Sequence, residues 1–263
     1  MLTEKMIEAK AADWTIPQNW DRFTAAEHAV WDLLFARQQA ALKGRAVDDF
    51  FRGLDVLRLS RPGIPDFDEL NERLFARTGW TIVSVPGLVP DDVFFEHLSK
   101  RRFPAGNFIR SAESLDYIEQ PDVFHDVFGH VPLLALPAVA DFMQAMGAEG
   151  LAALEAGALH RLARLYWYSV EFGLAREHGE TRIYGAGLLS SFGESRFALD
   201  SPEPRRAPFD LRQVLRTRYR SDAFQPGYFV IDGFGDLLRL LRDADLAGLY
   251  CGLAGEPDLD PAG

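Results

Sequence analysis

The chain has 263 residues, of which 48% are hydrophobic and 12% aromatic, enough to form one large packed domain. Its 39 acidic and 28 basic side chains give a net charge of −11, and such a surface repels phosphate backbones and anionic lipids. The composition therefore argues against a nucleic-acid-binding protein or a membrane-surface protein.

Compartment and membrane topology follow from the cysteine count and the apolar runs. The single cysteine, Cys251, excludes an internal disulfide and a cysteine-rich metal cluster, and suits a reducing compartment. The N-terminus has no apolar stretch typical of a secretory signal, and no run approaches 18 uninterrupted apolar residues. The sequence predicts a cytoplasmic globular protein without a transmembrane helix.

The first half of the chain is predicted to be mostly helical after a tail at 1–22. Thr24 and Glu27 form the Ser/Thr-x-x-Glu pattern of a capping box, which predicts a helix from there to about Gly44. β-Branched residues before Pro86 and Gly87 predict a strand. The remaining elements are helices at 47–59, 67–79 and 91–102, a strand at 81–85 and extended chain at 103–110.

The second half begins with a helix at 137–150, after which 151–179 shows a helical pattern with a break near Gly157 and an end at Gly179. Further elements are a strand and turn at 181–189, a helix at 210–219, a strand at 224–231 and a helix at 235–245. The predicted fold class is mainly α with a few short β-strands (α+β). One domain is predicted at 23–245, with a C-terminal tail at 246–263.

The stretch DVFHDVFGHVPLL (122–134) contains two histidines five residues apart, His125 and His130. On an ideal helix this spacing separates the side chains by about 140°. The two rings converge only if the helix ends or tightens between them, and Gly129 and Pro132 indicate such an ending. The spacing alone fits two structural histidines as well as half of a metal site.

A carboxylate in an apolar context lies downstream in YWYSVEFGL (166–174), where Glu171 shares a helical stripe with Trp167 and Leu174. Burying it unpaired would cost several kcal/mol, so it needs a cation or hydrogen-bond partners. One reading is a salt bridge to Arg164. The other is a two-histidine-one-carboxylate face, which binds Fe(II) with open positions and can also hold catalytic zinc.

Iron is favoured over zinc at such a face because the zinc-protease pattern HExxH has histidines four apart and a Glu beside the first. Here the spacing is five and the neighbour is Asp126. Three further features are ambiguous alone. Arg110 is either a carboxylate anchor or a surface arginine, Phe94 is either core or a stacking platform, and Ser190 lies in a glycine-containing turn.

Several motifs together carry a resemblance to a family. PDVFHDVFGHVPLL, LYWYSVEFGL, YGAGLLSSFGE and FQPGYFV occur in the order and at the separations found in the pterin-dependent aromatic amino acid hydroxylases. Within this family the chain resembles most closely the bacterial phenylalanine 4-hydroxylases, which consist of the catalytic domain alone. The resemblance spans roughly residues 20–240 and implies that 23–245 is such a catalytic domain.

The resemblance implies roles for individual residues. The iron ligands would be His125, His130 and Glu171. The substrate carboxylate would pair with Arg110, while the amino-acid pocket would be lined by Trp167 and Ser190. The pterin would stack on Phe94, with Gly87 and Val89 on a neighbouring loop and Asp126 as a nearby acid, where eukaryotic members have Glu. Tyr166 would lie near the iron without an assigned role.

The implied reaction is hydroxylation of L-phenylalanine to L-tyrosine with O2 and a tetrahydropterin at a mononuclear non-haem Fe(II). Trp167 matches the phenylalanine and tyrosine branches, and Val230 falls where tyrosine hydroxylases tend to have an acid, so phenylalanine is favoured. The alternatives are a tryptophan hydroxylase of the same family, a zinc hydrolase with Asp126 as base, and a non-catalytic helical module.

Two departures from the family pattern bear on assembly and on the substrate side. Ile118 and Glu119 replace the family's Thr and the first proline of its Pro-x-Pro stretch, so we expect a differently built substrate loop. We expect no regulatory domain before the catalytic part and no long heptad helix after it. We therefore expect a monomer whose partners are small molecules, with no nucleic-acid or membrane partner.

Overall fold

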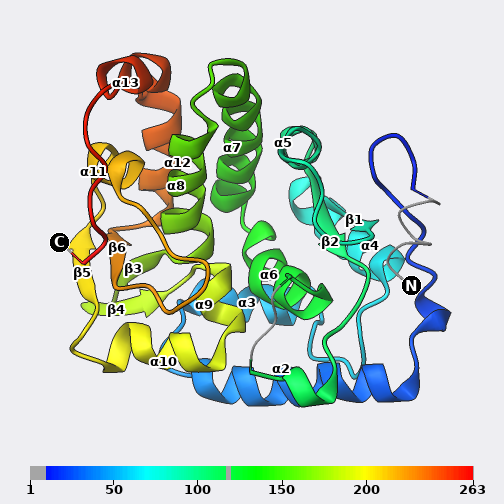
Figure 1. Ribbon diagram of the computed structural model, residues 1–263. Helices are drawn as coiled ribbons and strands as arrows, with labels where there is room; N and C mark the ends of the chain where they lie inside the picture. Colours follow the sequence, from blue (N-terminus) through cyan, green and yellow to red (C-terminus); the bar gives the residue numbers. More distant parts are fainter. Residues whose placement is uncertain (1–9, 117–119, 263) are drawn as a thin grey trace.

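The structure, a computed structural model, describes residues 10–116 and 120–262. Ile118, Glu119 and residues 1–9 lie outside the described residues. In Figure 1 the long helix α2 (Ala25–Leu42) runs along one side of the molecule, and two small sheets stand at opposite ends of the view. Helices dominate and the strands are few and short, so the predicted fold class is confirmed.

The first half of the chain follows its local signals closely. The Thr24 hydroxyl accepts the Glu27 N–H at 3.2 Å and the Glu27 carboxylate accepts the Thr24 N–H at 2.7 Å, which completes the predicted capping box. Gly79 follows the helix at 67–78 as its C-cap and has φ 73°. The other elements are η1 (Trp20–Arg22), α3 (Asp48–Val56), α4 (Phe67–Thr78), β1 (Thr81–Val85), α5 (Asp91–Ser99), β2 (Arg102–Gly106) and η2 (Ala112–Ser114).

The second half begins with a run of helices, and short strands and helices follow. It contains η3 (Phe124–His130), α6 (Val131–Leu134), α7 (Pro137–Glu155), α8 (Leu159–Tyr166), η4 (Trp167–Glu171), β3 (Leu174–Glu177), β4 (Glu180–Ile183), α9 (Ala186–Ser190), α10 (Phe192–Asp200), β5 (Arg205–Pro208), α11 (Leu211–Arg216), β6 (Gly227–Ile231), α12 (Phe234–Asp243) and α13 (Leu246–Gly252). α7 ends and α8 begins on either side of Gly157, where a break was predicted.

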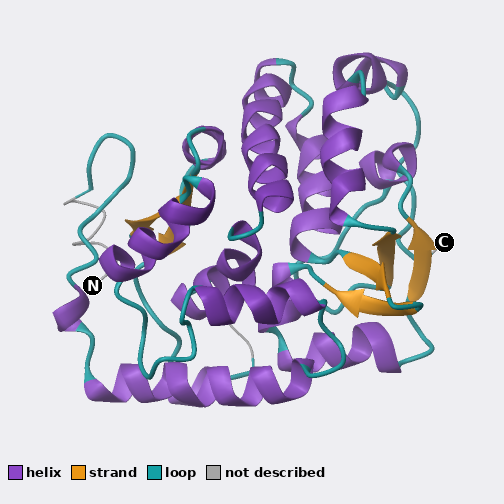
Figure 2. Cartoon of the chain, turned by 180° about the vertical axis from the view of Figure 1, so that it is seen from behind, coloured by secondary structure: helices purple, strands orange, loops and turns teal. Residues whose placement is uncertain are grey.

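The strands form two separate sheets, which Figure 2 shows at opposite edges with helices between them. β1 and β2 pair in parallel, and the second sheet has the order β4-β3-β6-β5. In the second sheet β3 pairs antiparallel with β4 and parallel with β6, which also pairs in parallel with β5. This sheet therefore holds the end of η4 beside the carboxyl-terminal part of the chain.

Two predicted helix ends are wrong. The helix predicted to reach Gly179 ends at Glu171, and 174–177 is strand β3 instead. Gly179, with φ 82°, closes the β3–β4 hairpin, because a left-handed glycine suits a hairpin turn as well as a helix end. The helix predicted at 91–102 ends at Ser99, because residues 102–106 pair with β1.

The sequence analysis missed α10, β5 and α13, as well as the short helices η1, η2 and α9. α13 lies inside 246–263, which was predicted to be a tail, and its Leu246 and the following Leu253 are buried. Further along, Leu259 forms a bridge with Thr217. The packed domain therefore extends beyond residue 245.

Aromatic contacts fix the position of η3 on the long helix α2. Trp31 and Phe35 of α2 pack edge-on against Phe124 and Phe128, with ring centroids 5.4 Å and 5.3 Å apart. All four side chains are buried, and each such pair contributes beyond its buried area. α2 thus provides a rigid base for the segment that contains both histidines.

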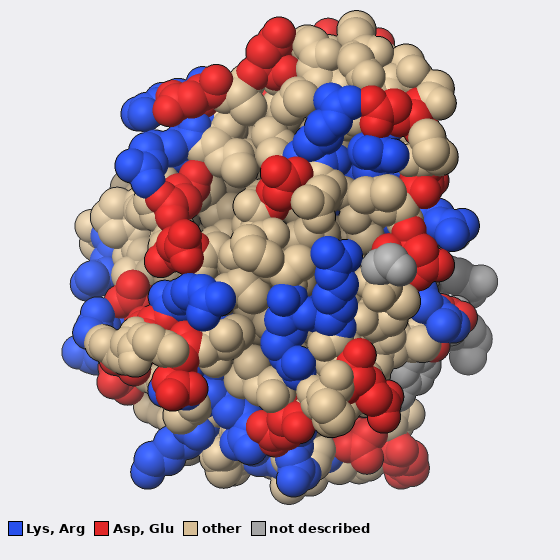
Figure 3. Space-filling view, turned by 90° about the vertical axis from the view of Figure 1, so that its left-hand side faces the viewer, with Lys and Arg blue, Asp and Glu red and all other residues tan. Residues whose placement is uncertain are grey.

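No single helix in the described ranges is long and apolar enough to cross a membrane. The pair Phe124–Leu134 and Pro137–Glu155 meets the length and composition test only when taken together, and it is bent by 117°. On the face seen in Figure 3, acidic and basic side chains are interspersed.

Close packing of α5 against α7 requires glycine at position 147. A Cβ there would lie 2.3 Å from the Ser99 backbone nitrogen, whereas a Cβ at Gly235 in α12 would meet nothing within 4 Å. We predict that Gly147→Ala lowers the free energy of unfolding by roughly 1–3 kcal/mol, because the helices must separate. Urea unfolding measures this, with Gly235→Ala as the control. Equal stability of Gly147→Ala and wild type would contradict the packing.

Candidate metal and substrate site

The two histidines lie on a π-helical turn, η3, rather than at a helix end. In a π-helix each N–H bonds the carbonyl five residues earlier, so side chains five apart lie on one side. The Nε2 atoms of His125 and His130 are 3.4 Å apart. The prediction that the helix ends or tightens at Gly129 and Pro132 is wrong, because it widens and continues as α6.

Gly129 allows close packing of η3 rather than ending a helix as was predicted. A Cβ at this position would lie 2.8 Å from the Ala186 carbonyl oxygen, so only glycine lets η3 approach α9 this closely. Since Ser190 also lies in α9, the close approach brings that hydroxyl next to His125.

Glu171 lies at the end of a second π-helical turn, η4, and faces both histidines. Its carboxylate oxygens are 3.2 Å from His130 Nε2 and 3.6 Å from His125 Nε2. One ligand atom from each of the three residues lies within 4.8 Å of the others. The alternative partner Arg164 instead pairs with Asp258 at 2.7 Å.

The protonation states of His125 and Glu171 suit a cation. Burial lowers the pKa of His125 to about 4, although Glu171 opposes the shift. Burial raises the pKa of Glu171, but His130 and His125 outweigh this and leave it below the ordinary value. At neutral pH the site therefore offers a neutral His125 ring and a carboxylate, the forms in which these side chains bind a metal.

Ser190 fixes which nitrogen of His125 is free. Its hydroxyl lies 2.8 Å from His125 Nδ1 and donates to the Ala186 carbonyl at 2.8 Å. With the hydroxyl proton directed at the Ala186 carbonyl, the Ser190 oxygen accepts from the Nδ1–H of His125, and Nε2 keeps its lone pair toward the triad. Ser190 was predicted as a pocket residue, and here it orients a histidine.

Arg110 is buried and held by Asp122, a residue that sequence reasoning did not single out. Its Nε and Nη2 atoms each lie 2.8 Å from an Asp122 oxygen, while Nη1 donates to the Leu115 carbonyl at 3.3 Å. Burial would raise the pKa of Asp122, but Arg110 keeps it lowered. Asp122 also accepts the His125 N–H at 3.0 Å, so one carboxylate positions both the arginine and the metal-facing histidine.

Trp167 occupies the middle of an aromatic stack. Phe172 and Tyr219 lie parallel to its ring, with centroids 4.6 Å and 4.2 Å away. Its indole N–H donates to Gln225 Oε1 at 3.1 Å. The sequence placed Trp167 in the pocket but gave no sign of Gln225, which is 58 residues away.

Phe94, predicted to stack on a pterin, contacts a residue beside the triad. Phe94 packs edge-on against Tyr166, with centroids 5.6 Å apart. The pKa of Tyr166 is raised by burial and by the nearby carboxylates of Glu171 and Asp126. Tyr166 therefore lies between the ring of Phe94 and the triad.

Asp126 and the loop after β1 approach each other across Phe108. The Asp126 carboxylate accepts the Gly106 N–H at 2.7 Å, and a Cβ at Gly106 or at Gly87 would lie within 4.0 Å of Phe108. Val89 is half-buried on the same loop as Gly87. Gly87 and Gly106 thus both approach the ring of Phe108, and Asp126 is fixed to Gly106.

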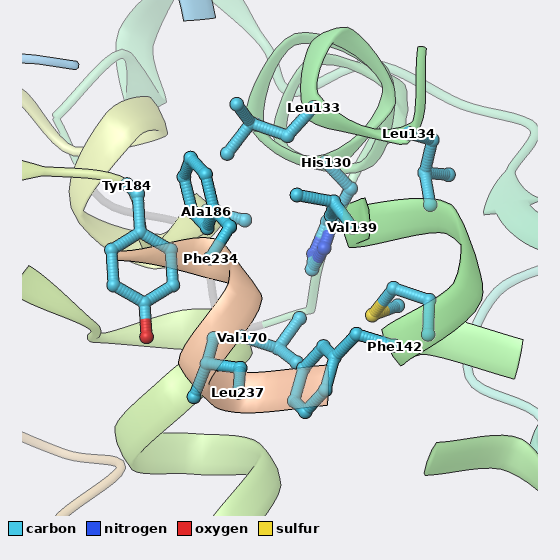
Figure 4. Close-up of a pocket in the computed structure, with 12 residues that line it drawn as sticks. His130, Leu133, Leu134, Val139, Phe142, Val170, Tyr184, Ala186, Phe234 and Leu237 are labelled. Carbon is cyan, nitrogen blue, oxygen red and sulfur yellow. The ribbon is translucent and has the colours of Figure 1, made fainter. Parts of the chain in front are cut away.

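An apolar pocket borders His130 (Figure 4). It encloses about 30 Å³ and touches the triad only through this histidine. Its other lining residues are Gly129, Leu133, Leu134, Val139, Phe142, Met143, Val170, Tyr184, Ala186, Phe234 and Leu237. These side chains keep the surroundings of His130 at low polarity, which strengthens its attraction to a bound cation.

The chain matches one family model over residues 4–245, that of the biopterin-dependent aromatic amino acid hydroxylases. It is 57% identical over 251 residues to phenylalanine-4-hydroxylase of Caulobacter vibrioides, covering 95% of this chain and 85% of that protein. It is also 57% identical over 238 residues to the Ralstonia nicotianae enzyme of the same name, covering 90% of this chain and 76% of that protein.

A solved structure is similar to this chain in both fold and sequence. The crystal structure of Chromobacterium violaceum phenylalanine hydroxylase with bound iron(III) and 7,8-dihydrobiopterin superimposes with a TM-score of 0.94. The two sequences are 50% identical, and the match covers 100% of this chain and 96% of that chain.

Removal of the Ser190 hydroxyl should weaken metal binding. In Ser190→Ala the His125 ring loses the partner of Nδ1, so its Nε2 lone pair is less firmly directed, and we predict a 10- to 100-fold loss of affinity, roughly. Anaerobic calorimetric titration with Fe(II) or Co(II) measures this. Ser195→Ala is the control, because that hydroxyl donates to the Phe192 carbonyl. An unchanged affinity in Ser190→Ala would contradict the assigned tautomer.

A second prediction concerns Glu194, a buried acid that accepts the Gln225 N–H at 2.8 Å and the Tyr228 hydroxyl at 3.0 Å. Burial raises its pKa from 4.5 to about 7. The folded chain therefore keeps a proton that the unfolded chain has lost, and the stability conferred by this group falls as the pH rises from 4.5 to 7.

Glu194→Gln has no such proton to lose. Relative to wild type it should gain roughly 2–3 kcal/mol in unfolding free energy between pH 5 and pH 8. Urea unfolding of both proteins at the two pH values gives this difference directly. Parallel pH dependences of the two proteins would show that Glu194 titrates normally.

Proposed function

The chain belongs to the biopterin-dependent aromatic amino acid hydroxylases, and we propose that it hydroxylates L-phenylalanine to L-tyrosine. The reaction uses O2 and a tetrahydropterin at a mononuclear non-haem Fe(II). The observation that carries the proposal is the convergence of His125, His130 and Glu171 on one point. Relatives named phenylalanine-4-hydroxylase at 57% identity support the choice of substrate.

The three side chains fit Fe(II) by donor chemistry. Two imidazole nitrogens and one carboxylate make the facial set that leaves coordination positions open for O2 and water. When bound, the iron and the tetrahydropterin supply the site of O2 activation and the two reducing electrons. The chain itself keeps the ligands in the correct tautomer and charge state, through Ser190 and through burial.

Substrate orientation is assigned to residues on both sides of His125. Arg110 pairs with the substrate α-carboxylate, and its Nη1 atom is the one not engaged by Asp122. Trp167 contributes to the wall around the aromatic ring, and Ser190 closes the pocket beside His125. Such positioning converts binding into a reactive geometry, which is the main catalytic contribution of these side chains.

The pterin is assigned to the side of the triad where Phe94 and the loop containing Gly87 and Val89 lie. Phe94 provides a ring face for stacking, because the neighbouring Phe95 and Tyr166 meet it edge-on and hold it in place. Asp126 places an acidic group next to this region and is itself fixed by the Gly106 N–H.

We further infer a monomeric, cytoplasmic enzyme. The single cysteine and the net charge of −11 support this inference, since a free exposed thiol suits a reducing compartment. The catalytic domain is assigned to residues 23–245 together with the packed α13.

The function is tested by an aerobic assay with Fe(II) and tetrahydropterin, offering phenylalanine, tryptophan and tyrosine separately. We predict that phenylalanine gives tyrosine fastest, and that Glu171→Ala loses bound iron and at least about 100-fold of the rate, because the facial set is incomplete. Glu180→Ala, an exposed acid in β4, is the control. Full activity of Glu171→Ala, or faster hydroxylation of tryptophan, would contradict the proposal.

A further inference from the structure

Gln225 is a buried amide that holds one short loop together. The loop comprises residues 218–226, between α11 and β6, and in Figure 1 it extends toward α9 and α10. Gln225 is 1% exposed. Its Nε2 donates to the carbonyls of Arg220 and Ala223, and its Oε1 accepts the Arg220 N–H at 3.2 Å.

The same amide oxygen also reaches out of the loop. It accepts the indole N–H of Trp167 at 3.1 Å, so all the hydrogen-bonding capacity of this amide is used. The backbone of Gln225 is fixed in turn, because its N–H donates to the buried Glu194 carboxylate at 2.8 Å. Glu194 lies in α10, so Gln225 links Trp167 to a rigid helix.

Stacking removes the remaining freedom of the indole. Phe172 and Tyr219 lie nearly parallel to it, at interplanar angles of 30° and 16°. Tyr219 belongs to the 218–226 loop. The carbonyl of the preceding residue, Arg218, accepts the Tyr168 hydroxyl at 2.5 Å. Because two rings already stack on Trp167, contact with a further aromatic ring is favoured at its edge, and edge-to-face contact is a favoured geometry.

We propose that Gln225 is a positioning residue for the aromatic substrate, acting through the indole N–H of Trp167. This hydrogen bond sets the direction in which the Trp167 ring points within its plane. Stacking on Phe172 and on Tyr219 sets the plane itself. The substrate ring then meets an edge of fixed direction. This inference rests on the proposed function, since Trp167 matters to catalysis only if it borders the amino-acid pocket.

If the Trp167–Gln225 hydrogen bond orients the substrate, its loss should weaken phenylalanine binding without a general loss of function. Gln225→Leu keeps the volume but leaves the indole N–H without its acceptor. The phenylalanine KM should rise about tenfold, while the tetrahydropterin KM, set on the Phe94 side, should change less than about twofold. Steady-state assays with each substrate varied in turn give both values.

The matched control is Gln144→Leu. Gln144 is a partly buried amide that donates to the Ser99 carbonyl at 3.1 Å and accepts from Arg101 at 2.8 Å, between α7 and α5. The Gln144→Leu variant loses its side-chain hydrogen bonds to Ser99 and Arg101, and these bonds do not involve Trp167. Its phenylalanine KM should equal that of wild type, and a tenfold rise in this variant would show that loss of stability alone explains the effect.

A double-mutant cycle tests the route through the indole. Trp167→Phe removes the N–H, so adding Gln225→Leu to it should change the phenylalanine KM by less than about twofold. An equal, multiplicative effect in both backgrounds would overturn the proposal. If Gln225→Leu fails to fold, Trp167→Phe alone must still raise the phenylalanine KM several-fold, and an unchanged value would overturn it equally.

Failure of this inference is distinguishable from failure of the proposed function. If wild type makes no tyrosine from phenylalanine, the function itself is wrong. If wild type is active but Gln225→Leu keeps both KM values, only the role of Gln225 is wrong.

Discussion

The site depends on two π-helical turns in its ligand-bearing segments. A spacing of five residues points His125 and His130 apart on an α-helix, and η3 removes the conflict by widening the turn. A second π-helical turn, η4, ends in Glu171. Such turns make poorer backbone geometry than an α-helix, so they persist only where packing compensates. For η3 that packing is the aromatic contact with Trp31 and Phe35 on α2.

Around the triad, single polar groups each fix two neighbours. Asp122 holds the Arg110 guanidinium and the His125 backbone, and Ser190 links the His125 ring to the Ala186 carbonyl. Gln225 similarly links its own loop to Trp167. Ser190 of α9 thus connects to the His125 ring, and Glu194 of α10 connects through Gln225 to the indole of Trp167.

The sequence predicted local elements where short-range chemistry decides them, such as the Thr24 capping box and the strand before Pro86. It failed where pairing decides: residues 174–177 look helical in sequence but form a strand, because β4 and β6 flank them. A period of 3.6 residues also contains no signal for a π-helical turn, so the convergence of His125 and His130 was inferred from resemblance rather than spacing.

Sequence reasoning named the triad and Ser190, yet Asp122 and Gln225 went unnoticed. Asp122 and Gln225 lie inside quoted motifs, but nothing local indicates that Asp122 pairs with Arg110 or that Gln225 meets Trp167. These partners are 12 and 58 residues apart, and only the folded chain brings them together. Long-range polar contacts of this kind are decided by tertiary packing, which single-residue patterns do not encode.

The central claim is that η3 and η4 direct His125 Nε2, His130 Nε2 and a Glu171 oxygen to one Fe(II). Crystallography of the iron-loaded protein with anomalous data at the iron edge tests it most directly. The account predicts a single iron bonded to these three atoms, with His125 Nδ1 still on Ser190 and a π-helical turn at 124–130. Iron bound elsewhere, or through His125 Nδ1, would contradict it.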